Sequence, residues 1–528
     1  MPDATYGEAV HAGGADRRRL GCRLLRRYPH ARRPREAADV GSNSGRVVVL
    51  RLHGAHIEIL ADARAPLRLA AELKGGKLRA SAIERTVEAM RDFHAVAEGA
   101  GAVRIIAAAT SAVRESSNAD ELVDAIARAT GIDVEIIDGE DEARYSFLGA
   151  VHGLAIEHGT LVDIGGGSLE LTTFRSRRMT GSYTLPLGAL RLSERFFRDD
   201  PPSSSEVRAV RELAADGLRE AGVRPLKSSE GLIGTGGTIR NLAKMDRRES
   251  NYPIPRVHGF VLHEKQIDLL TDLVASRTLA KRRRLRGLNA DRADSIVAGA
   301  LVLQTVMHEL GAEELTVSGQ GLREGIAYDR LGIATAPAED IRRGSVEALV
   351  GRFTQWQPER AVRRAAIASS VVDGVLPEAS AELLEMLRHA ATILDVGLSV
   401  DYYNREAHAA DVAIASDLTG FSHRQLAMVS ALIRGTEQQM AWAKGVARLL
   451  EPEDADLVQR AAVALSLADE IERRLAPGLP GIVSCVVRQR EIVVRAPVAP
   501  GWWLQKSEER FRTVFGKRLR VETAEVKQ

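Results

Sequence analysis

The sequence predicts two α/β domains in tandem, followed by an all-α domain and a small α+β domain. Two segments predict the tandem pair. Residues 38–44 and 162–170 each follow an apolar, strand-like run, carry an Asp at its end and then turn through Gly and Ser or Asn. Beyond residue 337 the alternation of strands and helices gives way to helical periodicity, which predicts the third domain. The length of 528 residues accommodates about three or four domains.

The first domain is expected at residues 37–150, after an arginine-rich extension at 1–36 that lacks the apolar stretch of a secretory signal and is expected to be disordered. Residues 118–121 have the pattern of a capping box, which predicts the start of a helix. The other expected elements are a β-hairpin at 47–52 and 55–60, a helix at 81–98, a buried strand at 103–108, a strand at 134–137 and a helix entered through the acidic residues 138–142.

The second domain is expected at residues 151–333 and contains two further glycine-rich turns between a strand and a helix, at 234–238 and 319–321. Its expected elements are a β-hairpin after the loop 165–168, a helix after 187–191, a strand at 232–235, a helix at 239–245, a long apolar helix at 292–310, a strand at 315–318 and a helix from Leu322.

A linker at 334–337 precedes the helical domain, which is expected at 340–480. The C-terminal domain, at 481–528, is expected to combine strands at 482–487, 491–494 and 518–521 with a helix at 507–514. Arginine runs at 281–286, 342–343 and 360–364 are expected to be solvated helix faces, although arginine also suits phosphate oxygens.

The composition excludes several classes of protein. A net charge of +2 does not indicate a general polyanion binder, and an aromatic content of 4% argues against the stacking platforms used for nucleic acid. Two distant cysteines exclude a disulfide framework and fit a reducing compartment. No apolar run approaches the roughly 20 residues that cross a bilayer. We therefore expect a cytoplasmic protein without a nucleic-acid or membrane partner.

The two Asp-containing turns point to phosphate chemistry. Glycine turns let backbone N–H groups and hydroxyls approach a phosphate closely, and Asp39 and Asp163 can hold Mg²⁺ beside it. The alternative is that both are ordinary turns that close hairpins. Phosphoryl transfer also needs a group that orients the nucleophile. The acidic corner at 140–142 can supply one, although acidic residues also favour helix N-termini for their interaction with the helix dipole.

Six motifs that occur in order over about residues 37–330 carry a resemblance to a known family. They are DVGSNS at 39–44, TSAVR at 110–114 with Asn118, GEDEAR at 139–144, DIGGGS at 163–168 with Glu170, GTGGT at 234–238 and LREG at 322–325. Together they resemble the Ppx/GppA phosphatases, which are exopolyphosphatases and guanosine pentaphosphate phosphohydrolases. The resemblance implies a duplicated actin-like domain pair of the sugar-kinase, ribonuclease H-like fold.

The resemblance also implies roles for individual residues. Glu142 would be the general base that activates water, and Glu170 would position that water or the metal. Asp39 and Asp163 would anchor Mg²⁺. The phosphate would be bound by Ser42, Asn43, Arg114, Gly166, Gly167 and Ser168. From the residues alone, Arg114 is equally well a surface ion pair, Asn118 a helix cap, and the turn at 234–238 either a nucleotide-site loop or a tight turn.

The helical domain resembles the HD-type domain of longer family members, but it departs from the metal-binding pattern. Leu394-Asp395 stands in place of the His-Asp pair, Arg360 stands where a first His is usual, and His408 is one remaining downstream histidine. Metal sites need about four ligands, so we expect a metal-free scaffold that extends a polyanion channel or mediates dimerisation. His389 and His423 are expected to be packing or surface residues.

The main functional prediction is a Mg²⁺-dependent exopolyphosphatase, as a homodimer, that releases orthophosphate processively from inorganic polyphosphate. The alternative with the same chemistry is a phosphohydrolase of guanosine pentaphosphate (pppGpp). An alternative of another class is a non-catalytic sensor of polyphosphate or an alarmone. A sugar or acetate kinase of the same fold is disfavoured, because GEDEAR at 139–144 fits the phosphatases better.

Overall fold

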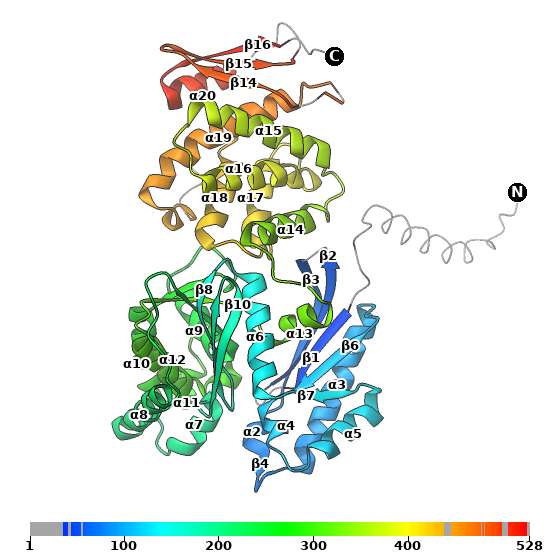
Figure 1. The fold of residues 1–528 in the computed structure, drawn as a ribbon, viewed down its shortest axis with the longest axis vertical. Coiled ribbons are helices and arrows are strands. Elements are labelled where there is room, and N and C mark those ends of the chain that lie inside the picture. Colours follow the sequence, from blue (N-terminus) through cyan, green and yellow to red (C-terminus); the bar gives the residue numbers. More distant parts are fainter. Residues whose placement is uncertain are drawn as a thin grey trace, which may run out of the picture.

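The computed structural model describes residues 35–524, except 41–43, 54–55, 438–444, 477, 480 and 499–504, and it describes no side chains for residues 35–40 or His53. Two α/β lobes lie side by side at one end of the molecule, the helical domain lies above them, and a small sheet caps the far end (Figure 1). Residues 1–34 lie outside the described part, so the expected disorder of 1–36 stays a prediction, although a strand already begins at Arg35. No helix of the described part is long and apolar enough to cross a membrane.

The first lobe is a five-stranded sheet in the order β3-β2-β1-β6-β7. The predicted β-hairpin is present, because β2 pairs antiparallel with β3, and β1 also pairs antiparallel with β2 but parallel with β6. Helices α3 and α5 cover one face and bury Phe93 and Ile126 against it. The elements are β1 (Arg35–Val40), β2 (Ser44–His53), β3 (His56–Pro66), α2 (Leu69–Glu72), β4 (Leu73–Lys74), β5 (Lys77–Leu78), α3 (Ala80–Gly99), β6 (Ile105–Ala109), α4 (Ser111–Arg114), α5 (Ala119–Thr130) and β7 (Val134–Ile136).

The second lobe repeats this arrangement. Its strand order, β10-β9-β8-β11-β13-β12, is that of the first lobe with one strand added. Asp39 near the end of β1 and Asp163 near the end of β8 therefore occupy equivalent positions in the two sheets, as a duplication requires. The elements are β8 (His158–Ile164), β9 (Leu169–Arg175), β10 (Arg178–Leu185), α7 (Ala189–Phe196), α8 (Ser204–Glu220), β11 (Gly231–Thr235), α9 (Gly236–Glu249), β12 (Val261–His263), α10 (Glu264–Ala275), α11 (Leu279–Arg282), η1 (Ala290–Arg292), α12 (Ile296–Leu310) and β13 (Glu314–Val317).

The lobes exchange one helix each. Helix α6 (Gly139–Gly153) follows the last strand of the first lobe but packs Phe147 and Val151 against the sheet of the second. Helix α13 (Leu322–Arg330) follows the second lobe but packs Tyr328 against β2 and β3 of the first. Both helices lie between the lobes (Figure 1). Helix α6, which carries Glu142, is thus packed on the sheet of the second lobe.

The two exchanged helices touch backbone to backbone at two glycines. A Cβ atom on Gly149 would lie 2.1 Å from the carbonyl oxygen of Gly321, and one on Gly325 would lie 1.7 Å from the carbonyl oxygen of Tyr145. No side chain fits at such distances, since even 3.0 Å is closer than real Cβ contacts. This crossing fixes α6 and α13 relative to each other.

The capping box predicted at Asn118 is wrong. The side chain of Asn118 makes no cap hydrogen bond to α5. Its Oδ1 accepts from the backbone N–H of Leu78 (2.8 Å) and its amide donates to the Leu78 carbonyl (3.1 Å) and to Glu121 (3.1 Å). The two-residue strand β5 leaves backbone groups unpaired, and Asn118 satisfies them.

The helical domain and the C-terminal sheet share one hydrophobic core. Phe511 and Leu519 of the C-terminal unit are buried in the same cluster as Val371 and Leu432 of the helical domain. The elements are α14 (Ala338–Val350), α15 (Pro358–Val375), α16 (Ala381–Ile393), η2 (Leu394–Ser399), α17 (Arg405–Ala415), α18 (His423–Arg434), η4 (Ala447–Leu449), α19 (Pro452–Glu472), β14 (Ser484–Val487), β15 (Glu491–Ala496), α20 (Gln505–Phe515) and β16 (Arg518–Thr523).

Residues 419–423, at and just before the start of α18, connect the helical domain to both lobes through polar contacts. The backbone N–H of Gly420 donates to the carbonyl of Gly153, the last residue of α6 (2.8 Å). Thr419 Oγ1 lies 3.3 Å from His56 Nδ1 on the first lobe. His423 Nε2 donates to the carbonyl of His258 on the second lobe (2.9 Å). As predicted, His423 is a packing residue.

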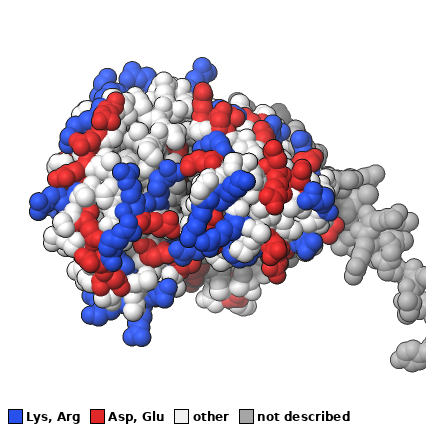
Figure 2. Space-filling view, turned by 90° about the horizontal axis from the view of Figure 1, so that it is seen from below, with Lys and Arg blue, Asp and Glu red and all other residues white. Residues whose placement is uncertain are grey.

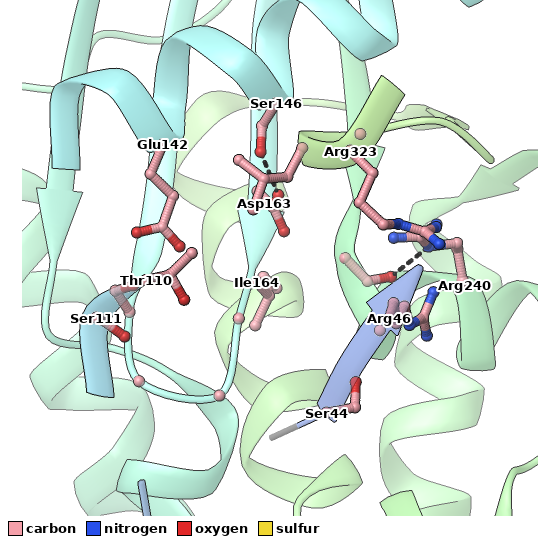
Figure 3. Close-up of a pocket in the computed structure, with 18 of the residues that line it drawn as sticks. Ser44, Arg46, Thr110, Ser111, Glu142, Ser146, Asp163, Ile164, Arg240 and Arg323 are labelled. Carbon is pink, nitrogen blue, oxygen red and sulfur yellow. Dashed lines mark hydrogen bonds between the residues drawn. The ribbon is translucent and has the colours of Figure 1, made fainter. Parts of the chain in front are cut away.

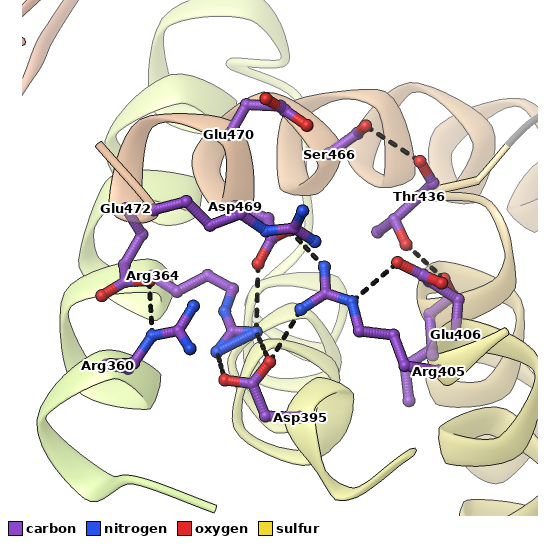
Figure 4. Close-up of polar contacts among 12 residues, drawn as sticks. Arg360, Arg364, Asp395, Arg405, Glu406, Thr436, Ser466, Asp469, Glu470 and Glu472 are labelled. Carbon is purple, nitrogen blue, oxygen red and sulfur yellow. Dashed lines mark hydrogen bonds and ion pairs between the residues drawn. The ribbon is translucent and has the colours of Figure 1, made fainter. Parts of the chain in front are cut away.

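Buried ion pairs occupy the place of the HD-type metal pattern (Figure 4). Arg364, whose side chain is fully buried, donates to Asp395 Oδ1 (3.0 Å) and also contacts Asp469 (3.2 Å). Arg405 contacts the same two carboxylates. Arg360, in contrast, pairs with Glu472 (2.9 Å). Asp395 therefore serves as a partner for guanidinium groups.

The sequence predicts that the arginine runs are solvated helix faces, but one arginine of each run is buried in the structure. Arg282, Arg342 and Arg364 are buried. Each contacts a carboxylate: Asp200 for Arg282, Glu385 for Arg342 and Asp395 for Arg364. These side chains face inward because the chain supplies a paired acid at each position.

Candidate active site

The pocket between the lobes is lined by both halves of the duplication (Figure 3). It encloses about 110 Å³. Ser44, Thr110 and Ser111 come from the first lobe, and the loop 165–168 and the turn 236–237 come from the second. Both exchanged helices contribute as well, through Glu142 and Ser146 of α6 and through Arg323 of α13. The pocket lining therefore combines residues of both lobes and of both exchanged helices.

The loop 165–168 is held in shape by the start of α7. The N–H of Ala189 donates to the carbonyl of Gly165, and those of Leu190 and Arg191 donate to the carbonyl of Gly166, each at 3.0 Å. A Cβ on Gly188 would lie 2.2 Å from the carbonyl carbon of Gly167, so α7 approaches as closely as backbone allows. Gly166, Gly167 and Ser168, all predicted phosphate ligands, line the pocket.

Three carboxylates gather on one side of the site. Asp163 on β8 and Glu170 on β9 are directly paired across the strands, and Asp163 accepts a hydrogen bond from Ser146 Oγ (2.9 Å). Burial raises the pKa of Asp163. Burial, followed by the Glu142 and Asp163 carboxylates, raises the pKa of Glu170 well above its usual range. The buried Oε1 of Glu170 has no hydrogen-bond partner among the described residues.

These carboxylates fit Mg²⁺. A cation would offset the repulsion that raises the pKa of Glu170, and Mg²⁺ needs only one or two carboxylates, because water and phosphate oxygens complete its shell. The described side chains include no group of three His, Cys, Asp or Glu residues that would hold a metal by themselves. Asp39 is placed only as backbone, and Ser42 and Asn43 lie outside the described residues, so their roles stay predictions.

Arg114 orients Glu142 in this structure. Its guanidinium donates to the carbonyl of Ile137 (2.6 Å) and to Glu142 Oε2 (3.2 Å). The side chain of Asp138 accepts from the N–H of Asp141 (2.8 Å) and caps α6. Glu142 is therefore fixed by the cap, by the glycine crossing and by Arg114. Arg114 as a phosphate ligand stays a prediction.

Sequence reasoning missed the opposite side of the pocket, which is made of arginines. Arg46 on β2, Arg240 on α9, Arg292 at the end of η1 and Arg323 on α13 all line it, together with Glu324, which forms an ion pair with Arg323 (3.5 Å). Among the described residues, Arg240 donates to the carbonyls of Gly236 (3.0 Å) and Gly319 (2.9 Å) and to no carboxylate. Burial lowers the pKa of Arg46, and the nearby Arg240 and Arg323 lower it further. Two local signals could have predicted these arginines as pocket residues. Arg46 lies on the same strand face as Ser44, and Arg240 follows Gly236 by one helical turn.

The turn at 234–238 is explained by close packing. Gly236 has a φ of +91°. A Cβ there would lie 2.5 Å from Asp163 Oδ1, so glycine lets the strand-to-helix turn pass directly beside that carboxylate. The turn therefore shapes the carboxylate side of the pocket.

Known proteins are similar to this chain in sequence and in fold. A model of the Ppx/GppA phosphatase family matches residues 48–333, and a model of Ppx/GppA phosphatase, domain III, matches residues 341–478. Exopolyphosphatase 1 of Mycobacterium tuberculosis is 32% identical over 326 residues, which cover 61% of this chain and 94% of that protein.

Two solved structures are similar over the lobes. A Ppx/GppA family member from Aquifex aeolicus is 29% identical with a TM-score of 0.51, and the match covers 57% of this chain and 97% of that one. An exopolyphosphatase from Cytophaga hutchinsonii is 25% identical with a TM-score of 0.53, and the match covers 57% and 99% of the two chains.

Proposed function

The chain belongs to the Ppx/GppA phosphatase family, and on this basis we propose that it is a Mg²⁺-dependent exopolyphosphatase that acts processively on inorganic polyphosphate. The two-sided pocket carries the proposal. Glu142 and Asp163 line one side, with Glu170 buried behind them. Arg46, Arg240, Arg292 and Arg323 line the other side, where Arg323 forms an ion pair with Glu324 (3.5 Å) and the other three have no carboxylate partner among the described residues. Buried cations without counter-charges are costly, so the arginine side favours a multiply charged anion.

The proposed reaction is hydrolysis of the terminal phosphoanhydride bond. Glu142 accepts a proton from a water molecule as the water attacks the terminal phosphorus. The bond to the next phosphate breaks, which releases orthophosphate and a chain shorter by one unit. Arg46, Arg240, Arg292 and Arg323 offset the negative charge on the phosphate oxygens, and the backbone of the loop 165–168 holds the group in line.

Mg²⁺, when bound at Asp163 and at the predicted ligand Asp39, would neutralise charge on the phosphate oxygens. Two residues of the chain support this site. Ser146 holds Asp163 in place through its hydrogen bond. Burial and the Glu142 carboxylate raise the pKa of Glu170, and a cation bound beside it would lower that pKa.

Phosphohydrolysis of pppGpp remains the alternative with the same chemistry. Two of the similar proteins are exopolyphosphatases, which favours polyphosphate. So does the turn at Gly236, which is explained by Asp163 and needs no nucleotide. We also propose a homodimer, which light scattering would test.

The test is phosphate release from long-chain polyphosphate and from pppGpp, with Mg²⁺, by the wild type and by Glu142→Gln. Loss of a general base costs about 10²–10⁴-fold in rate, so polyphosphate turnover should fall by that factor while the variant still binds the chain. Cleavage of pppGpp alone would establish the alternative. Tight polyphosphate binding without turnover of either substrate would contradict the enzyme and leave the sensor.

A further inference from the structure

A second pocket adjoins the active site at the lower end of the two lobes, where α2, α4 and α7 lie (Figure 1). It encloses about 360 Å³, whereas the active-site pocket encloses about 110 Å³. Ser111 on α4 and Gly167 in the loop 165–168 line both pockets. The two spaces are therefore neighbours that share part of one wall.

The second pocket extends from buried residues to the surface of the molecule. Ser111, Ala112 and Gly167, which line its inner end, are buried. Glu194 and Arg195, which line its outer end, are exposed. The lobes seen from below carry interspersed basic and acidic side chains, so this face has no field of a single sign (Figure 2). The pocket therefore connects the wall of the active site with solvent.

The charges that line the second pocket balance each other. Arg191 and Arg195 supply two positive charges, which Glu115 and Glu194 offset with two negative ones. Arg191 Nη2 donates to both carboxylate oxygens of Glu115 (2.7 and 2.8 Å), which ties α7 of the second lobe to the end of α4 in the first. Passage of an ion requires contacts that are weak enough to release it. A balanced lining suits an anion that passes through, whereas the arginine side of the active site suits one that stays bound.

Processive hydrolysis creates the need for a separate route. Arg46, Arg240 and Arg323 lie on the opposite side of the active site from Ser111 and Glu142 (Figure 3). In-line attack by a water molecule at Glu142 puts the leaving chain on the arginine side. After cleavage, the shortened chain therefore blocks that side for the released orthophosphate. Orthophosphate must leave on the Ser111 side, or the chain must dissociate first.

We infer that the second pocket is an exit for orthophosphate, which leaves past Ser111 and Gly167 and reaches solvent beside Arg195. The inference rests on the proposed function, because it explains how orthophosphate leaves while the shortened chain stays bound. Arg195 has no carboxylate partner among the described residues, so its charge is available to the leaving anion. Because Arg191 and Glu115 belong to different lobes, the width of the exit depends on how closely the lobes approach each other.

The first test narrows the exit with Ala70→Phe, which adds a ring at a half-buried position of the lining. The matched control is Ala127→Phe, at a half-buried alanine of α5 that lines neither pocket. Unfolding curves first confirm that both variants are folded. We expect Ala70→Phe to lower steady-state phosphate release from long polyphosphate about tenfold, because product release becomes limiting, at an unchanged rate of the first cleavage in a single turnover. Gel electrophoresis should show chains of intermediate length for Ala70→Phe but not for the wild type or the control.

The second test uses the wild type, and it decides alone if Ala70→Phe does not fold. Orthophosphate can enter by a separate exit while the chain is bound, so its inhibition should be noncompetitive with long polyphosphate. Competitive inhibition, a wild type that accumulates intermediate chains, or an Ala70→Phe variant as processive as the control would overturn the inference. The proposed hydrolysis would stand in each of these cases, because phosphate is still released. A wild type that releases no phosphate from polyphosphate would overturn both.

Discussion

Substitution of Gly325 by alanine tests how the active site is held together. The added Cβ would lie 1.7 Å from the carbonyl oxygen of Tyr145, so α6 and α13 must separate by more than 1 Å to restore normal contact. Overpacking of a core typically costs about 1–3 kcal/mol. We expect the upper end of this range, because backbone meets backbone and no side chain can rotate away. At about 2–4 °C per kcal/mol for a domain of this size, Tm should fall by roughly 6–12 °C.

Activity should fall further than stability suggests. Helix α6 carries Glu142 and α13 carries Arg323, and a 1 Å misplacement costs about 10²-fold in rate. Differential scanning calorimetry and kcat for polyphosphate measure the two effects. The matched control is Gly217→Ala, inside α8, whose Cβ would be 3.6 Å from its nearest neighbour, Leu187 Cδ1. That change should stabilise by about 0.5–1 kcal/mol. A Gly325→Ala protein with the Tm and kcat of the wild type would refute the glycine crossing.

Three further predictions follow from charge. Because the pKa values of Glu170 and Asp163 are raised, protons compete with Mg²⁺ for these carboxylates, so Mg²⁺ affinity should increase as pH rises. Titration calorimetry at several pH values measures this, and a flat dependence would contradict it. Arg364→Met leaves Asp395 and Asp469 without one of their buried partners and should lower the free energy of unfolding by about 3–5 kcal/mol, measured by urea unfolding. The control, Arg343→Met on the exposed face of α14, should lower it by less than about 1 kcal/mol. Arg46→Ala should raise the KM for polyphosphate at least tenfold, and an unchanged KM would remove Arg46 from the binding site.

Much of the fold could be predicted from local sequence. Each Asp-containing turn lies between a strand and the next strand of a hairpin, and the spacing of apolar residues located most helices within a few residues. Glu142 was correctly placed at the start of a helix because acidic residues and the preceding strand are local signals. What failed was non-local. No periodicity shows that α6 packs on the sheet of the other lobe, or that Asn118 pairs with Leu78, forty residues away in sequence.

The arginines show the same limit. Arg46, Arg240, Arg292 and Arg323 come from four separate elements, and only the closed fold brings them to one wall. In the helical domain, Arg360 and Arg364 lie one helical turn apart on the same face of α15, and only the packing against the neighbouring helices decides that Arg364 reaches Asp395 and Arg360 reaches Glu472. The sequence identifies these arginines but does not show which groups they contact in the folded protein.

The exchanged helices decide how this protein can be divided. A chain cut after residue 154 would give a first fragment in which Val48, Leu50 and Leu52 lose the cover of Tyr328, and a second fragment whose sheet lacks Phe147 and Val151. The first fragment would carry α6, which packs on the second lobe, and the second fragment would carry α13, which packs on the first. Neither fragment is therefore an autonomous folding unit. The two halves of the duplication are therefore expected to recover structure only when they are refolded together. They should be studied by fragment complementation, not by separate expression.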